Sequence, residues 1–363
     1  MVPLSVLDLS PVTSGGSGAI ALRNSLDLAE HADRLGYTRY WLAEHHNLAS
    51  IASAAPEIMI GQIAVRTRNL RVGSGGVMLP NHAPLMVAER FKVLEALFPG
   101  RIDLGIGRAP GTDPVTSLAL RMRQEARADD DFLERLQELL LMATNGYPEG
   151  HPFRAVRAMP ADVALPPIWL LGSSDYGAQL AAAIGAGFAF AHHFATHDAT
   201  AAMQFYRRHF RPSALRARPY PILAVAAVCA DTEEAAERLA STMDLAFVRR
   251  QKGEYLPLAS PEEAAAYPYT AQEREKIQGN RARLFVGTRQ TLLDRLAPLL
   301  AATGADEQRL QSTIMPPASS PTRSWRMHSG SPQRRRAPRH NAPSCGSPAR
   351  RSGAMIPRPF ANI

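Results

Sequence analysis

Short apolar runs alternate with longer segments of helical periodicity along most of the chain. The apolar runs have the length of strands, and the segments between them repeat apolar residues at the spacing of an amphipathic helix. The expected strands are Leu4–Asp8, Tyr40–Ala43, Leu70–Leu79, Ile102–Ile106, Ile168–Leu171, Phe188–Phe194 and Ile222–Val228. The expected helices are Ala21–Leu35, Pro56–Val65, Pro84–Leu97, Asp129–Ala143, Ala178–Ile184, Ala199–His209, Thr232–Met243 and Thr288–Ala302. This alternation predicts an α/β fold with a parallel sheet, and the number of strand–helix pairs favours a closed (β/α)8 TIM barrel over an open sheet.

Two stretches, 145–166 and 250–283, interrupt the alternation of strands and helices. Long connections without a strand are usually functional in a compact domain. We interpret both as insertions near the mouth of the barrel, and the second as a mobile lid.

The alternation ends after Asp306, where an eighth strand should follow. Only Leu310–Met315 is apolar enough for a shortened strand, so we expect the eighth strand to be degraded. Residues 1–311 are therefore predicted to form the barrel. Residues 312–363 are predicted to form a disordered basic tail rich in Pro, Ser and Arg. A change of reading frame near Gln308 in a GC-rich gene would produce this composition.

The tail also explains the net charge of +8. Nine arginines and no lysine or acidic residue lie in 312–363, which leaves a formal charge of −1 for the rest of the chain. Because the body is nearly neutral, we expect no nucleic-acid partner. The chain has neither an apolar run of about 18 residues nor a secretory signal, so no membrane span is expected. Cys229 and Cys345 lie far apart, which is compatible with a reducing cytoplasm.

Two pairs of histidines follow expected strands, where a TIM barrel carries its active site. His45 and His46 follow the second strand, and His192 and His193 lie at the end of the sixth. An imidazole can accept or donate a proton near neutral pH, which favours a catalytic role. A packed and hydrogen-bonded pair is the structural alternative. We expect no metal, because the first strand is not followed by the His-x-His motif of barrel hydrolases.

Glycine-rich segments mark three further strand ends. Gly75 and Gly76 indicate close approach by a flat ligand or an unusual backbone, with a β-bulge as the commoner alternative. Arg108 is interpreted as a phosphate clamp rather than a salt bridge on the rim. In the turn Gly172–Gly177, backbone N–H groups and hydroxyls can bind an anion at a helix N-terminus. An ordinary N-cap is the alternative there, and the presence of Arg108 favours the phosphate site.

These motifs, in this order, resemble those of the bacterial-luciferase-like flavin monooxygenases. The resemblance runs from Pro3 to about Glu307. It is most specific in the segments 40–47 (YWLAEHHN), 71–80 (RVGSGGVMLP) and 98–108 (FPGRIDLGIGR). The match is closest to single-subunit, luciferase-alpha-like bacterial proteins whose substrates are mostly unassigned.

The resemblance implies roles for individual residues. His45 corresponds to a histidine implicated in flavin peroxide chemistry. Gly75 and Gly76 correspond to a non-prolyl cis peptide beside the flavin ring, and Arg108 to an arginine that binds the FMN phosphate.

The remaining candidates fall into two groups. The phosphate-binding turn corresponds to Gly172, Ser173, Ser174 and Tyr176, with Gly172 standing where luciferase itself has a carboxylate. The candidates for the substrate pocket are His46, His192 and His193.

The implied enzyme is a monooxygenase that acts on paired donors with incorporation of O2 (EC 1.14 type). A separate flavin reductase would supply reduced FMN, and O2 would form a C4a-peroxide that oxidises an aldehyde, a ketone or another small organic substrate. Two alternatives stay open: a barrel that binds flavin without turnover, and an oxidoreductase that uses the deazaflavin F420. The sequence identifies neither the substrate nor whether the chain forms a homodimer.

Overall fold

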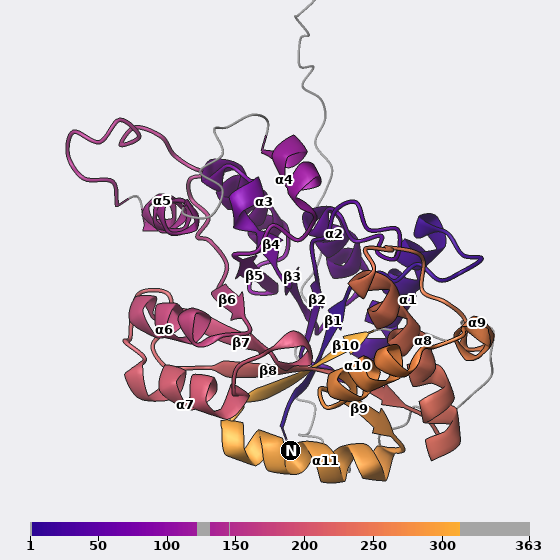
Figure 1. Ribbon diagram of the computed structural model, residues 1–363. Coiled ribbons are helices and arrows are strands. Elements are labelled where there is room, and N and C mark those ends of the chain that lie inside the picture. The colour runs from indigo at the N-terminus through magenta and orange to yellow at the C-terminus, as the bar shows by residue number, and fades with distance from the viewer. Residues whose placement is uncertain (1, 122–130, 145, 313–363) are drawn as a thin grey trace, which may run out of the picture. The chain divides into compact units, whose positions relative to one another are not determined.

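The computed structural model describes residues 2–121, 131–144 and 146–312. The predicted tail therefore lies outside the described residues from position 313 on, as do Asn145 and the first two residues of the predicted helix Asp129–Ala143. Within the described ranges the chain alternates strands and helices around one barrel (Figure 1).

Eight parallel strands of the described chain close into a ring in the order β1, β2, β3, β5, β6, β7, β8 and β10. Their bounds are Leu4–Asp8, Arg39–Leu42, Arg71–Ser74, Ile102–Gly107, Ile168–Gly172, Gly187–Ala191, Pro221–Cys229 and Glu307–Ser312. Strand β4 (Val77–Met78) continues β3 along β5, and β9 (Leu284–Gly287) pairs with the C-terminal half of β8. The predicted (β/α)8 TIM barrel is confirmed.

The eighth strand of the barrel is present, so the prediction that it is degraded is wrong. β10 pairs with β1 from Leu4↔Gln308 to Asp8↔Ser312, and with β8 from Glu307↔Ile222 to Gln311↔Ala226. In Figure 1 it is the yellow strand between β1 and β8. Backbone hydrogen bonds form with both neighbours whatever the side chains are, so even a polar sequence can complete the ring.

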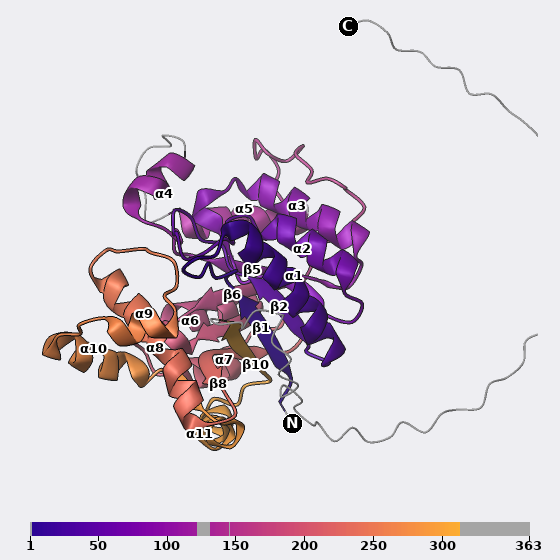
Figure 2. The ribbon, with the colours of Figure 1, turned by 90° about the vertical axis from the view of Figure 1, so that its right-hand side faces the viewer.

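Helices cover the outside of the ring. α1 (Gly18–Arg34), α2 (Pro56–Arg66) and α3 (Pro84–Leu97) lie side by side in Figure 2. The other helices are α4 (Pro114–Leu120), α5 (Phe132–Thr144), α6 (Asp175–Ile184), α7 (Ala199–His209), α8 (Glu233–Gln251), α9 (Pro261–Ala266), α10 (Ala271–Arg281) and α11 (Arg289–Thr303), with short 3-10 turns η1 (Leu79–Asn81) and η2 (His192–Phe194). None of the helices in the described ranges has the length and apolar character needed to cross a membrane.

The predicted insertion 250–283 contains α9 and α10. Each of these helices begins with a capping box, in which the N-cap hydroxyl and a glutamate three residues later satisfy each other's backbone N–H groups. The segment therefore has defined local structure and packs against α8.

Most predicted elements are present, with several differences. The predicted strand Leu70–Leu79 is divided into β3 and β4, and the predicted strand Phe188–Phe194 ends at Ala191 and is followed by η2. α4, α9, α10 and β9 were not predicted. Ala55 occupies the N-cap position of α2, and the nearby Ser53 hydroxyl donates to the Ala43 carbonyl at 2.6 Å.

The N-terminal ends of the strands enclose a buried ionic layer. The Arg39 guanidinium pairs with Asp103 at 2.7 Å and with Glu307 at 2.8 Å, and Arg71 pairs with Asp103 at 2.6 Å. Asp103 also accepts hydrogen bonds from the indole N–H groups of Trp41 and Trp169. This end of the barrel is therefore filled, and the opposite end carries the predicted site residues.

Candidate active site

All predicted site residues follow the C-terminal ends of parallel strands. His45 follows β2, Gly75 and Gly76 follow β3, and Arg108 follows β5. Gly172 ends β6, and the two later histidines follow β7 in η2. Because the strands form one parallel ring, these residues share one mouth of the barrel, where TIM-barrel enzymes place their chemistry.

His45 has a neutral imidazole with an unused ring nitrogen. Its backbone N–H donates to the Ser53 carbonyl, while the buried Nδ1 atom has no hydrogen-bond partner. Burial lowers the pKa of His45 from 6.5 to about 4; Glu44 opposes this shift, and His46 and Arg250 add to it. The ring is therefore uncharged at neutral pH. A neutral imidazole has one protonated nitrogen, which can donate a proton, and one unprotonated nitrogen, which can accept one.

His46 belongs to a different cluster, which is centred on Glu44. The buried Glu44 carboxylate is bound by His46 Nε2 and His82 Nε2, each at 2.8 Å from Oε1, and by the Met78 N–H at 2.8 Å from Oε2. Burial raises the pKa of Glu44, but these three hydrogen bonds outweigh it, so the pKa lies below its usual value. The two adjacent histidines therefore differ: the ring of His46 is hydrogen-bonded to Glu44, whereas Nδ1 of His45 has no partner.

Sequence reasoning gave Glu44 and His82 no role. Glu44 lies in the segment 40–47 that carries the family resemblance, at the end of a buried strand. That position could have indicated hydrogen-bond partners for Glu44, because a buried carboxylate requires them. His82 gave no comparable signal, since 38 residues separate it from Glu44.

Gly75 and Gly76 are joined by a cis peptide bond, which confirms the backbone state that the resemblance implied. Both positions are also tightly packed. A Cβ atom on Gly75 would lie 2.6 Å from Leu7 Cδ1, and one on Gly76 would lie 2.8 Å from the Gly105 carbonyl oxygen. The close approach of these strand ends therefore requires glycine at both positions.

Arg108 and Tyr176 come together at the edge of the mouth. The Arg108 guanidinium carbon lies 4.7 Å from the centre of the Tyr176 ring, within the range of a cation–π contact. Arg108 is exposed and forms no ion pair with any described residue, so it is not the salt bridge on the rim that was the alternative.

Ser174 occupies the N-cap position of α6, but its hydroxyl makes no capping hydrogen bond. Ser173 and Gly172 precede it at the end of β6 and are partly buried. The hydroxyls, the helix N-terminus and the unpaired Arg108 guanidinium together have the donors that a phosphate requires.

His192 and His193 lie in η2 at the same mouth. Nδ1 of His192 is buried without a partner, and Nδ1 of His193 lies 3.3 Å from the Ala224 carbonyl oxygen. Burial lowers the pKa of His192, and it lowers the pKa of His193 to about 4. Among the described residues, no three His, Cys, Asp or Glu side chains are grouped so that they could hold a metal ion.

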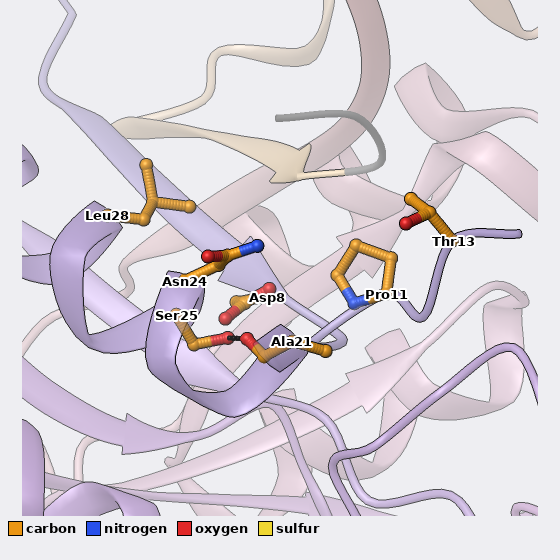
Figure 3. A pocket seen from close by; sticks show the side chains of 7 residues that line it. All are labelled: Asp8, Pro11, Thr13, Ala21, Asn24, Ser25 and Leu28. Carbon is orange, nitrogen blue, oxygen red and sulfur yellow. Dashed lines mark hydrogen bonds between the residues drawn. The ribbon is translucent and has the colours of Figure 1, made fainter. Parts of the chain in front are cut away.

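A small pocket beside the mouth contains none of the predicted site residues. It lies between the end of β1 and α1 and is lined by Asp8, Pro11, Thr13, Ala21, Asn24, Ser25 and Leu28 (Figure 3). The Asp8 carboxylate is engaged there, because it accepts hydrogen bonds from the Tyr40 hydroxyl and the Ser10 N–H. We therefore assign this pocket no part in the site.

Comparison with known proteins identifies the family. The family model described as luciferase-like monooxygenase matches residues 2–307. A luciferase-like monooxygenase from Escherichia coli (strain K12) is 43% identical over 313 residues, which cover 86% of this chain and 92% of that protein.

Two solved structures share the fold. The structure of apo-MsnO8 is 38% identical with a TM-score of 0.78, covering 86% of this chain and 93% of that one. The oxygenating constituent of 3,6-diketocamphane monooxygenase from Pseudomonas putida, solved with FMN, is 20% identical with a TM-score of 0.61, covering 86% of this chain and 92% of that one. With its eight-stranded barrel and its motifs at one mouth, the chain belongs to the luciferase-like monooxygenase family.

Proposed function

We propose that the chain is an FMN-dependent monooxygenase that oxidises an aldehyde, a ketone or another small organic substrate with O2. A separate flavin reductase would supply the reduced FMN. The observation that carries this proposal is the placement of a neutral, unpartnered His45 and an unpaired Arg108 at one mouth of the barrel.

The residues fit FMN in two respects. The guanidinium of Arg108 can pair with phosphate oxygens, while the uncapped Ser174 hydroxyl and the α6 N-terminus supply neutral donors. The fold neighbour from Pseudomonas putida was solved with FMN, which supports the same choice of cofactor.

When bound, reduced FMN would supply the electrons that activate O2. In this proposal Arg108 holds the phosphate end of the cofactor and thereby orients it. His45 holds or transfers a proton at its unused Nδ1 atom, which the surrounding burial keeps uncharged.

The insertion 250–283 begins at the mouth, because Arg250 lies near enough to influence the pKa of both His45 and His193. We propose that this segment excludes water from the site, as flavin oxygen chemistry requires. If deletion within 255–268 left the yield of product per reduced FMN unchanged, this role would be wrong.

The test supplies the purified chain with O2, a flavin reductase and FMN, together with a panel of aldehydes and ketones. We expect a product whose mass contains one atom of ¹⁸O from labelled O2, and none without the chain. FMN binding with no labelled product would favour the flavin-binding barrel without turnover. Tighter binding of F420 than of FMN in a titration would favour the deazaflavin-dependent oxidoreductase.

A further inference from the structure

Glu44 joins two segments that lie far apart in the sequence, its own loop after β2 and the segment 78–82. The carboxylate is 1% exposed and binds His46 from the loop after β2, His82 from the end of η1, and the N–H of Met78 in β4. An ionised carboxylate can only accept hydrogen bonds, so both imidazoles must donate their Nε2–H to it.

Both segments carry or adjoin groups of the candidate active site. His45 lies between Glu44 and His46 in the chain, and Val77–Met78 directly follows the Gly75–Gly76 peptide. Packing around Glu44 is tight, since a Cβ atom on Gly111 would lie 2.9 Å from the Glu44 carbonyl oxygen. The backbone of Glu44 is therefore closely packed, and its side-chain hydrogen bonds connect the two segments.

We propose that Glu44 is a positioning residue that holds His45 in register with the Gly75–Gly76 peptide. It acts through its hydrogen bonds and does not itself touch the reacting atoms. The inference rests on the proposed function for its catalytic meaning, but the geometry it describes is that of the free protein.

Glu44→Gln tests the proposal, because the amide can keep all three contacts only if both imidazoles change tautomer and accept from its NH2 group; in the other orientation the NH2 group faces the Met78 N–H. The measurement is the pKa of His45 in the free protein, followed by NMR with ¹⁵N-labelled histidine and assigned with His45→Gln. Loss of the charge alone would lower this pKa, because Glu44 opposes the effect of burial. Loss of positioning would expose the ring and raise the pKa by one unit or more, toward 6.5.

Glu57→Gln is the matched control, because Glu57 pairs with Arg90 between α2 and α3. It should leave the pKa of His45 unchanged. If Glu44→Gln does not fold, His82→Gln removes one of the three partners and should raise the pKa by a smaller amount. A folded variant in which the pKa falls or stays constant overturns the proposal. A rise in a protein that shows no turnover would instead count against the proposed function.

A separate observation concerns the first three residues of β10. Glu307 is fully buried and satisfied, with hydrogen bonds from Ser5, Arg39 and the Tyr220 hydroxyl. The next two residues differ: Nε2 of Gln308 and all three side-chain nitrogens of Arg309 are buried without a hydrogen-bond partner. The side chains of β10 therefore change from hydrogen-bonded to unpartnered between two adjacent residues.

The Arg309 side chain lies inside the barrel and is 0% exposed. Its guanidinium carbon lies 3.4 Å from the centre of the Trp41 indole, and burial lowers its pKa to about 9. A cation–π contact is worth about 2 kcal/mol when desolvated, whereas an unpaired buried charge costs several kcal/mol. The position therefore suits an apolar side chain better than arginine.

We infer that the reading frame of the gene changes close to the codon of Gln308. The family model ends at residue 307, and the match to the Escherichia coli relative, which covers 86% of this chain, extends slightly past it. Side chains up to Glu307 fit the barrel, and the two that follow do not.

The first test translates the coding DNA from codon 308 in the two other frames. We expect one of them to encode apolar residues at positions 308–310, and the absence of such a frame would overturn the inference. The second test is the double variant Gln308→Leu/Arg309→Met, which should raise the melting temperature by about 5 °C. Arg23→Met, an exposed arginine on α1, is the control, and an equal response of both variants would also overturn it.

Discussion

The ionic layer at the N-terminal end of the barrel and the histidines at its C-terminal mouth differ in how their buried polar atoms are satisfied. At the N-terminal end, Arg39 and Asp103 are paired, and the Asp103 carboxylate also accepts from two indoles. At the C-terminal mouth, Nδ1 of His45 and Nδ1 of His192 have no partner. An unsatisfied buried polar group costs about 1–3 kcal/mol. The comparison indicates that one end supplies stability while the other retains polar atoms for function.

The largest effect is expected from Asp103→Asn. The substitution keeps the size of the side chain but removes the charge that pairs with Arg39 and Arg71. We expect the free energy of unfolding, measured with urea, to fall by about 3–5 kcal/mol. Glu30→Gln, which breaks the exposed pair with Arg66, is the control and should cost less than about 1 kcal/mol. Equal losses would remove the contrast between the two ends.

At the mouth, His45→Asn should act on catalysis rather than on stability. A positioned acid or base contributes at least about a hundredfold to the rate, so we expect kcat to fall by this factor or more. The melting temperature should change little, because the lost imidazole nitrogen had no partner. His197→Asn, at an exposed histidine, should leave kcat unchanged. A variant of His45 with normal kcat would show that the unpartnered nitrogen has no catalytic use.

Arg108→Gln should weaken FMN binding by about 2 kcal/mol, or roughly thirtyfold, because a charge-assisted hydrogen bond to the phosphate is lost. Fluorescence titration measures the dissociation constant. Riboflavin, which lacks the phosphate, is the matched control, and its affinity should not change. If riboflavin binding weakened equally, Arg108 would not be a phosphate ligand.

The smallest effect concerns pH. The folded-state pKa of His45 and of His193 is about 4, below the ordinary value of 6.5. Between these values the unfolded chain binds more protons, so the free energy of unfolding decreases as the pH falls. The slope is at most about 1.4 kcal/mol per pH unit for each histidine. Asp103, whose pKa is lowered by Arg39 and Arg71 against the effect of burial, keeps its contribution through this window.

Urea unfolding at pH 7.5, 6.5 and 5.5 measures this slope. His193→Gln should make it shallower, because the variant removes one of the histidines whose pKa is lowered in the folded protein. An unchanged slope would mean that the folded state does not hold His193 neutral.

Sequence reasoning placed the candidate residues at the strand ends where the structure has them, because strand and helix periods are local properties. It also anticipated the cis bond at Gly75–Gly76 through the family resemblance. It did not find His82, which is bound to Glu44 only through the fold. It also rejected the eighth strand on the basis of side-chain polarity, although backbone pairing decides whether a strand forms in an otherwise complete ring.

The sequence by itself determined the (β/α)8 architecture, the order of the motifs and their common position at the C-terminal ends of the strands. The tertiary structure decided which neighbouring histidine is held by Glu44 and which keeps a free nitrogen. It also decided that Glu307 meets Arg39 and Ser5, residues separated from it by 268 and 302 positions. Such pairings depend on closure of the barrel, because only the completed ring brings the first and last strands together.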